Sequence, residues 1–434
     1  MFRVSTAALL LSFLSVVPVK CSIDLKESVE ELTAQIKHLA HKGCFSSDAF
    51  KLKRHFLRDR NTTCNDGTPA GYYLRKAHGS KRWIVYLDGG EFCDSSASCG
   101  KRYRDVRQLM SSRSWNETRI GSGILSTDPH ENPSWWNANH VYVPYCSSDA
   151  WSGNASKWET GERFSFLGTR ILEKVIEELM RKGLAEAKRL LLAGSSAGGI
   201  GVILNLDRLA RRIKMAGLKV EVRGLADSGW YLDMPIPETN QIQQGMDYWR
   251  GVVPEDCARR NPTRKWKCYF AENVYRTDSK SPKPSPLFVF QWLYDQAQIA
   301  WVVSGTFRMP DDAHKQKHIH KIALRLGSEL RKSLNRTKDL ACSVFVPSCI
   351  AHTILTRDDW LKVVVGGKNL NDAIDEWYQS SGKSLASCRP LIESCPLWRF
   401  QNCARTCPAL DKSLLPSPHG SGKPDSALPS RSNQ

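Results

Sequence analysis

Apolar residues recur along this chain at two spacings, and the two spacings alternate. Short apolar runs of strand length lie at residues 72–74, 83–87, 141–144, 190–193, 220–226, 287–292 and 343–346. Residues 164–183 and 200–213 instead have apolar side chains at every third or fourth position, which is the spacing of one helix face. Strands that alternate with helices build a mainly parallel sheet. The pattern therefore predicts an α/β fold with a mainly parallel central sheet flanked by helices.

The two ends of the chain differ in composition from this central part. Arg3 precedes an apolar run over residues 7–17, which has the length of a secretory signal and is too short to span a bilayer. Residues 1–21 are therefore predicted to be a signal peptide, which makes the protein secreted and extracellular. Residues 22–60 are polar with apolar side chains at helical spacing, which predicts an N-terminal helical segment. Residues 409–434 are rich in Ser, Pro, Lys and Gly, so we expect a disordered tail after one catalytic domain over residues 60–408.

A turn of small residues near the middle of the chain carries the strongest chemical signal. An apolar strand ends in Gly194-Ser195-Ser196-Ala197-Gly198, and a helix follows. This order is typical of the G-x-S-x-G nucleophile elbow, in which a sharp turn lifts the serine hydroxyl clear of the sheet. Glycine is needed on both sides because the strand and helix backbones leave no room for a Cβ atom. Ser196 is therefore the candidate nucleophile.

A second glycine turn lies upstream, where residues 83–87 run into Asp88-Gly89-Gly90-Glu91. An oxyanion hole requires backbone N–H groups that converge on the oxygen of a tetrahedral intermediate. The amides of Gly90 or Glu91, together with that of Ala197, are the candidate donors. One such donor typically contributes about 3 kcal/mol of transition-state stabilisation. An ordinary glycine turn without a catalytic role is the alternative.

Two later strands deliver the candidate partners of the serine. Residues 287–292 lead to Asp295, and residues 343–346 lead through a loop to His352. The order Ser196, Asp295, His352 is the serine, acid, histidine order of α/β hydrolases. In such a triad the histidine takes the proton of the serine, and the aspartate orients the imidazole and stabilises its positive charge.

Both partners have rivals in the sequence. Asp227 also follows a strand and is the alternative acid. His314, His318 and His320 lie in a polar segment that is predicted to be a surface helix, where a histidine is usually solvated. His352 is favoured over them because it stands in a loop after an apolar strand.

Cysteine content and glycosylation signals agree with export. The chain has fourteen cysteines, and four N-x-S/T sequons, at Asn61, Asn116, Asn154 and Asn335. Cleavage after Cys21 would leave an odd number of cysteines, so either one thiol is free or Cys21 is retained and paired. A zinc site is the alternative for the C-terminal cysteines, but they lack a C-x-x-C pair and an oxidising compartment favours disulfides; they are Cys388, Cys395, Cys403 and Cys407. We expect no metal.

The chain is strongly basic, with 62 Lys and Arg against 44 Asp and Glu and a formal net charge of +18. For a secreted protein this excess favours sulfated glycans over nucleic acid as polyanionic partners. Basic residues are densest at residues 51–60, 101–107, 208–214 and 259–267. No nucleic-acid motif is present, and no nucleic-acid partner is expected.

Several segments resemble one known family, the Notum carboxylesterases. Members of this family are secreted and remove palmitoleate from a serine of Wnt proteins, and they fall within the wider pectin acetylesterase family. The resemblance extends over about residues 60–408, and it is carried by residues 64–73, 132–139, 144–149, 193–199, 223–230 and 291–295.

The resemblance implies an α/β-hydrolase fold and the triad of Ser196, Asp295 and His352, with oxyanion amides at Gly90, Glu91 and Ala197. It also implies an apolar acyl pocket, to which Phe92, Ile242, Tyr269 and Phe270 correspond. No cofactor is implied. The implied partners are a lipidated Wnt protein and, because family members bind heparan sulfate chains, heparan sulfate or a glypican.

Two departures from the family pattern bear on the substrate. Where Notum has Gly-Gly-Trp, this chain has Gly89-Gly90-Glu91, and a carboxylate beside a developing oxyanion would repel it unless the side chain points away. Residues 232–245 are also shorter than the corresponding Notum loop, which carries its own cysteine pair over the pocket mouth. These departures indicate a divergent paralogue. An esterase for a shorter acyl group without Wnt activity, and a non-catalytic glycan-binding protein, are the alternative functions.

Overall fold

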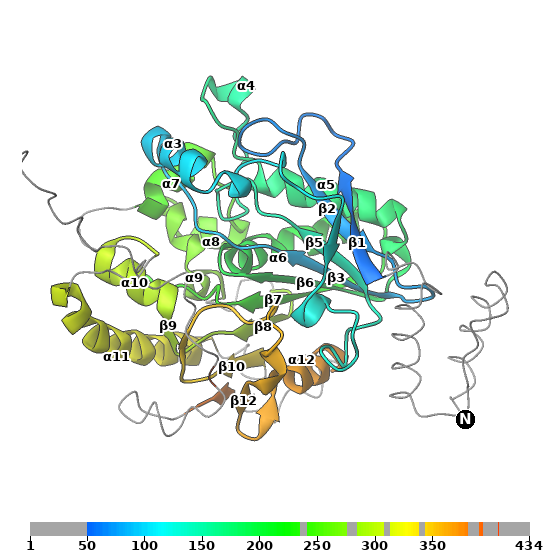
Figure 1. Ribbon diagram of the computed structural model, residues 1–434. Coiled ribbons are helices and arrows are strands. Elements are labelled where there is room, and N and C mark those ends of the chain that lie inside the picture. Colours follow the sequence, from blue (N-terminus) through cyan, green and yellow to red (C-terminus); the bar gives the residue numbers. More distant parts are fainter. Residues whose placement is uncertain are drawn as a thin grey trace, which may run out of the picture.

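A ten-stranded sheet runs through the centre of the molecule in the computed structural model (Figure 1). The structure describes residues 50–234, 241–275, 284–307, 313–337, 343–380, 390–393 and 407, without the side chains of residues 313–318. In spatial order the strands are β14 (Leu391–Ile392), β10 (Val344–Val346), β8 (Leu287–Phe290), β7 (Glu221–Asp227), β6 (Arg189–Ser195), β3 (Arg82–Leu87), β5 (Asn139–Val143), β2 (Gly71–Arg75), β1 (Lys51–Phe56) and β4 (Thr118–Ile120).

The pairing in this sheet confirms the mainly parallel arrangement that the sequence predicts. Every neighbouring pair from β14 to β5 is parallel, whereas β5 with β2, β2 with β1, and β1 with β4 are antiparallel. The strand that carries the elbow, β6, lies between β3 and β7. The carboxyl ends of these three strands therefore meet at one edge of the sheet, which is where open α/β sheets place their sites.

Helices cover both faces of the sheet. The α-helices are α3 (Ser96–Asp105), α4 (Lys157–Thr160), α5 (Gly168–Arg181), α6 (Ala197–Met215), α7 (Gln241–Trp249), α8 (Glu255–Arg260), α9 (Ala271–Tyr275), α10 (Gln296–Ser304), α11 (Ala313–Arg336) and α12 (Leu370–Gln379). Helices α5, α6, α9 and α11 share one apolar core with the sheet, and α12 packs into a second core on the opposite face (Figure 1). In the described residues no helix has both the length and the apolar composition needed to span a membrane.

The central strands are apolar at every position because both of their faces are buried. In β3, Trp83, Val85 and Leu87 pack into the core shared with α5 and α6, whereas Ile84 and Tyr86 pack into the core on the side of α12. Side chains of a strand alternate between the two faces, so a sheet with helices on both faces selects continuous apolar runs. This is why the sequence pattern located these strands well.

The predicted helical segment over residues 22–60 is wrong at its C-terminal end. Residues Lys51–Phe56 form β1, which pairs with β2 and β4, so the sheet begins before residue 60. Leu52 is the one fully buried side chain of this strand. Because its neighbours in the strand are mostly polar, residues 51–56 lack the apolar run that predicts a strand. The predicted signal peptide, the helical spacing before residue 40 and the tail after residue 408 all lie outside the described residues.

Eight of the cysteines form disulfides in the described part of the chain. The pairs are Cys64 with Cys146, Cys93 with Cys99, Cys257 with Cys268, and Cys349 with Cys407. Cys407 belongs to the C-terminal cluster for which zinc was the alternative, and here its sulfur is bonded to Cys349. Disulfides suit the predicted extracellular compartment.

Three of the four sequons lie on exposed residues, namely Asn61, Asn116 and Asn335. Asn154 is half-buried, and its Oδ1 accepts a hydrogen bond from Arg170 Nε at 2.5 Å. Modification of all four remains a prediction, and we expect Asn154 to be the poorest acceptor because its amide is already engaged.

Candidate active site

Ser196 occupies the sharp turn between β6 and α6 that the sequence predicts. Its φ is +57°, which an L-residue adopts only where the surroundings force it. A Cβ atom at position 194 would lie 2.4 Å from the carbonyl oxygen of Gly198, and one at position 198 would lie 2.0 Å from that of Leu87. Both glycines are therefore required for β3, β6 and α6 to approach each other, and the turn presents the Ser196 side chain at the sheet edge.

His352 and Asp295 complete a hydrogen-bonded series with this serine. His352 Nε2 lies 2.8 Å from Ser196 Oγ, and His352 Nδ1 lies 3.0 Å from Asp295 Oδ2. Short strands set this geometry, because β11 (Ile350–Ala351) pairs in parallel with β9 (Tyr294–Asp295) immediately before the histidine. The aspartate is fully buried and the histidine nearly so.

Asp295 is itself held by neighbouring groups. It caps α10, where its Oδ1 accepts a hydrogen bond from the amide of Gln298 at 2.9 Å. Its Oδ2 also accepts from Gln291 Nε2 at 3.0 Å. These contacts fix the orientation of the carboxylate oxygen that faces His352. A carboxylate that orients an imidazole needs such a fixed position.

The rivals in the sequence lie elsewhere. Asp227 is fully buried at the end of β7, and burial raises the pKa of its carboxyl. Its carboxylate accepts hydrogen bonds from Ser195 and from backbone amides, while Asp295 receives the contact from the imidazole. His320 is exposed on α11; His314 and His318 are on the same helix, with side chains outside the described set. The structure therefore brings together Ser196, Asp295 and His352.

The loop after β3 lies against the nucleophile turn. A Cβ atom at Gly89 would lie 2.6 Å from the carbonyl oxygen of Ser195, so this loop and the elbow are in direct contact. Gly90 and Glu91 have φ values of +140° and +53°. Gly90, Glu91 and Ala197 all line the same cavity as Ser196 and His352. This is the placement that an oxyanion hole requires, and the role of these amides remains a proposal.

Arg102 holds this loop in place, and no sequence pattern predicts this contact. The Arg102 side chain is 6 % exposed; its Nε donates to Ser148 Oγ at 2.9 Å, and its Nη2 donates to the carbonyl of Gly90. Its Nη1 lies 3.7 Å from Glu91 Oε2, and the Glu91 side chain is 41 % exposed. The Glu91 carboxylate is therefore paired with a buried cation.

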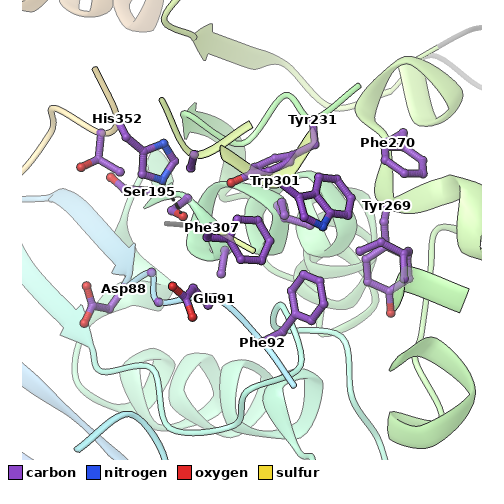
Figure 2. Close-up of a pocket in the computed structure, with 18 of the residues that line it drawn as sticks. Asp88, Glu91, Phe92, Ser195, Tyr231, Tyr269, Phe270, Trp301, Phe307 and His352 are labelled. Atoms are coloured by element: carbon purple, nitrogen blue, oxygen red, sulfur yellow. Dashed lines mark hydrogen bonds between the residues drawn. The ribbon is translucent and has the colours of Figure 1, made fainter. Parts of the chain in front are cut away.

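The cavity at Ser196 has a polar end and an aromatic end (Figure 2). Asp88, Glu91, Ser195 and His352 lie toward one side, and the rings of Trp301, Tyr269 and Phe270 lie toward the other. The four residues predicted for an acyl pocket, Phe92, Ile242, Tyr269 and Phe270, all line it. Five further apolar or aromatic residues that line the cavity were not predicted: Ile200, Tyr231, Ala297, Trp301 and Phe307.

Ring contacts join these walls into one apolar surface. Phe92 packs edge-on against Phe307 with ring centroids 5.4 Å apart, and Tyr231 packs against Trp301 at 6.0 Å. The hydroxyl of Tyr269 bonds with Ser152 Oγ at 2.6 Å, which satisfies its polar atom. Tyr231 is buried beside Ser196, and this burial raises the pKa of its hydroxyl well above the ordinary value. This wall is suited to an apolar ligand group.

Comparison with known proteins agrees with this geometry. The pectinacetylesterase family model matches residues 45–405. The chain belongs to this family. Within the family it is similar to Notum proteins: it is 41 % identical over 398 residues to the palmitoleoyl-protein carboxylesterase NOTUM of Homo sapiens, a match that covers 87 % of this chain and 76 % of the human protein. With notum1a of Danio rerio the identity is 40 % over 411 residues, covering 89 % and 79 % of the two chains.

A solved structure of a family member has the same fold. The Wnt deacylase Notum from Drosophila superimposes with a TM-score of 0.70 at 41 % sequence identity, over 80 % of this chain and 97 % of the other. The predicted α/β-hydrolase fold and the resemblance to the Notum family are confirmed. The shortened loop over residues 232–245 stays a prediction, because residues 235–240 lie outside the described residues.

Proposed function

We propose that this chain is a secreted serine carboxylesterase that removes a fatty acyl group from a hydroxyl of a protein, with palmitoleoylated Wnt as its substrate and inhibition of Wnt signalling as its effect. The observation that carries the proposal is the series of hydrogen bonds from Asp295 through His352 to Ser196, at the mouth of an aromatic cavity. The relatives named palmitoleoyl-protein carboxylesterase and Wnt deacylase support the same chemistry.

In the proposed reaction His352 Nε2 takes the proton of Ser196 Oγ as this oxygen attacks the ester carbonyl. The carbonyl oxygen becomes an oxyanion, which the amides of Gly90, Glu91 and Ala197 stabilise. The imidazolium then returns its proton to the alcohol oxygen of the substrate, which leaves. A water molecule, deprotonated by the same imidazole, attacks the acyl carbonyl of the acyl enzyme. The bond from this carbon to Ser196 Oγ then breaks, Oγ takes the proton back from the imidazolium, and the fatty acid is released.

The acyl chain is proposed to occupy the aromatic end of the cavity, and the alcohol side to face the polar end. Burial of one methylene group contributes about 0.8 kcal/mol, so several methylenes against Phe92, Trp301 and Phe307 supply substantial binding energy. A direct test is incubation of a palmitoleoylated Wnt peptide with the protein, followed by mass spectrometry. We expect loss of the acyl mass; a peptide with the acyl group in amide linkage is the matched control. An ester that stays intact contradicts the proposal.

A second candidate function, hydrolysis of shorter esters, is favoured by two observations. The cavity has a volume of about 270 Å³, near the lower limit of about 300 Å³ for small-molecule sites. Glu91 also places a carboxylate at its polar end. Rates with p-nitrophenyl esters from two to sixteen carbons distinguish the candidates, because a maximum at two carbons contradicts a long acyl chain in the aromatic end.

Narrowing the cavity should shift this chain-length preference. Ala297 lines the cavity from α10, and Ala297→Leu adds three carbon atoms to the cavity wall. Because a mismatch of one methylene in an apolar pocket costs about 1–3 kcal/mol, we expect kcat/KM for the longest ester to fall by at least about tenfold. The acetate ester, whose acyl group occupies the smallest part of the cavity, is the internal control and should be affected much less than the longest ester. An equal loss for both esters would mean that the substitution disturbs the fold rather than the pocket.

The charge of Glu91 should slow the formation of the oxyanion. Glu91→Gln keeps the size of the side chain and removes the carboxylate. For a partly exposed charge this relieves on the order of 1 kcal/mol of repulsion. We therefore expect kcat for p-nitrophenyl esters to rise about two- to tenfold with little change in KM. Glu91→Asp, which retains the charge, is the control. A fall in kcat for Glu91→Gln would show instead that the pair with Arg102 is needed to hold the loop.

Heparan sulfate or a glypican is proposed as a further partner on the basis of the net charge of +18. Part of this charge is neutralised locally: Arg208 and Arg212 pair with Glu173, and Arg211 pairs with Glu255. We expect retention on a heparin column that is lost at elevated salt, since interactions between exposed charges are screened.

A further inference from the structure

Asp227, the rival acid of the sequence, stands at the junction of the two segments that carry Ser196 and His352. It ends β7, next to β6 in the sheet, and it is fully buried. Its backbone carbonyl accepts a hydrogen bond from the amide of Ser196 at 2.8 Å. Its carboxylate Oδ2 accepts one from Ser195 Oγ at 2.6 Å. The residue therefore contacts the nucleophile turn through both its backbone and its side chain.

The same carboxylate holds the loop that follows His352. Oδ2 accepts from the amides of Ile354 at 2.8 Å and Leu355 at 3.1 Å. Oδ1 accepts from Ser228 Oγ at 2.9 Å, and Ser228 Oγ in turn accepts from the amide of Thr353 at 2.9 Å. Three consecutive amides after the histidine are thus bound, directly or through one hydroxyl, to one buried side chain.

The loop needs such support. Thr353 has a φ of +59°, a conformation that is unfavourable for a β-branched residue and that persists only where the surroundings fix it. Before the histidine, the backbone is fixed by the pairing of β11 with β9 and by the disulfide of Cys349 with Cys407. After the histidine, the carboxylate of Asp227 supplies the corresponding anchor.

We propose that Asp227 is a positioning residue that sets the distance between Ser196 and His352 by binding the turn before the nucleophile and the loop after the histidine. Asp295 orients the imidazole ring, and Asp227 fixes the backbone from which the ring projects. The proposal rests on the proposed function, since the alignment matters only if Ser196 and His352 react together. Tyr86 extends the network by donating to Ser195 Oγ at 2.8 Å.

Asp227→Asn and Ser228→Ala test this role. Asparagine keeps one acceptor oxygen but replaces the other with an N–H₂ group, which cannot accept from the hydroxyl and amide donors that face it. A displacement of about 1 Å at reacting groups costs about 10²-fold in rate. We expect kcat for p-nitrophenyl acetate to fall about 10²-fold in Asp227→Asn and about tenfold in Ser228→Ala, with KM within about threefold. Rates are expressed per site titrated with a fluorophosphonate, so that unfolded protein is not counted.

Two further readouts separate positioning from a general loss of stability. The pH profile of kcat/KM should keep its shape, because Asp295 still sets the environment of the imidazole. Hydrogen exchange of a peptide that contains residues 353–355 should become faster in Asp227→Asn, while a peptide from β3 should keep its protection. The proposal would be overturned if Asp227→Asn had the kcat of the wild type per titrated site and the same hydrogen-exchange rate in residues 353–355. If the wild-type protein neither reacts with the fluorophosphonate nor hydrolyses an ester, the proposed function is contradicted. In that case the hydrogen-exchange rates of residues 353–355 in wild type and Asp227→Asn alone decide whether Asp227 holds the loop.

Discussion

Ser196→Ala is expected to lower kcat for ester hydrolysis by on the order of 10⁶-fold, because loss of the nucleophile from a working triad removes the covalent step. The Ser196 hydroxyl is the group that lies 2.8 Å from His352 Nε2, so its removal leaves the histidine without the atom that it activates. The measurement is the initial rate with p-nitrophenyl esters, repeated with a palmitoleoylated Wnt peptide and mass spectrometry.

The adjacent serine provides a matched control. Ser195 also lines the cavity, but its Oγ donates to Asp227 and accepts from Tyr86, whereas Ser196 Oγ is the hydroxyl that contacts the imidazole. A fluorophosphonate should label the wild type and Ser195→Ala, the latter more slowly, and should not label Ser196→Ala. Labelling that persists in Ser196→Ala, or delipidation by that variant, would contradict the assignment of the nucleophile. A wild type without labelling would favour a non-catalytic, glycan-binding protein.

The nucleophile turn could be predicted from the sequence because its determinants are local. Gly194 and Gly198 flank the serine within one strand, one turn and one helix, and these elements leave a pattern in adjacent residues. The approach of Gly198 to the carbonyl of Leu87 in β3, by contrast, is visible only in the fold. The central strands were also evident, since burial on both faces makes them continuously apolar. Asp295 and His352 were predicted from their positions after apolar strands, from their order in the chain and from the family resemblance.

Features that depend on long-range pairing could not be predicted. Strand β1 is polar, and only its pairing with β2 and β4 makes it part of the sheet. The hydrogen bond of Arg102 with Ser148 and those of Asp227 with the amides of Ile354 and Leu355 join segments that are far apart in the chain, and the residue types alone do not specify them. The sequence makes Asp227 a candidate acid because it follows a strand. Only the fold shows that its carboxylate accepts hydrogen bonds from Ser195 and from backbone amides.

Asp295→Asn is expected to lower kcat by about 10⁴-fold while the protein keeps its fold. In the wild type the carboxylate Oδ2 accepts from His352 Nδ1–H, so Nε2 carries the lone pair that faces Ser196. An asparagine can present its N–H₂ group to Nδ1 instead, which selects the tautomer with the proton on Nε2. That tautomer cannot accept the serine proton, so the nucleophile is present but not activated.

This result distinguishes the two buried aspartates. Asp295→Asn changes the protonation of the imidazole, so its residual activity should rise with pH as hydroxide replaces the missing base. Asp227→Asn changes only the placement of the loop, so its smaller loss should be the same at every pH. Comparing the kcat profiles of the two variants between about pH 6 and pH 10 therefore assigns one aspartate to the imidazole and the other to the backbone. A 10⁴-fold loss in Asp227→Asn with near-normal rates in Asp295→Asn would reverse that assignment. The hydrogen bond from His352 Nδ1 to Asp295 would then not be the contact that orients the imidazole.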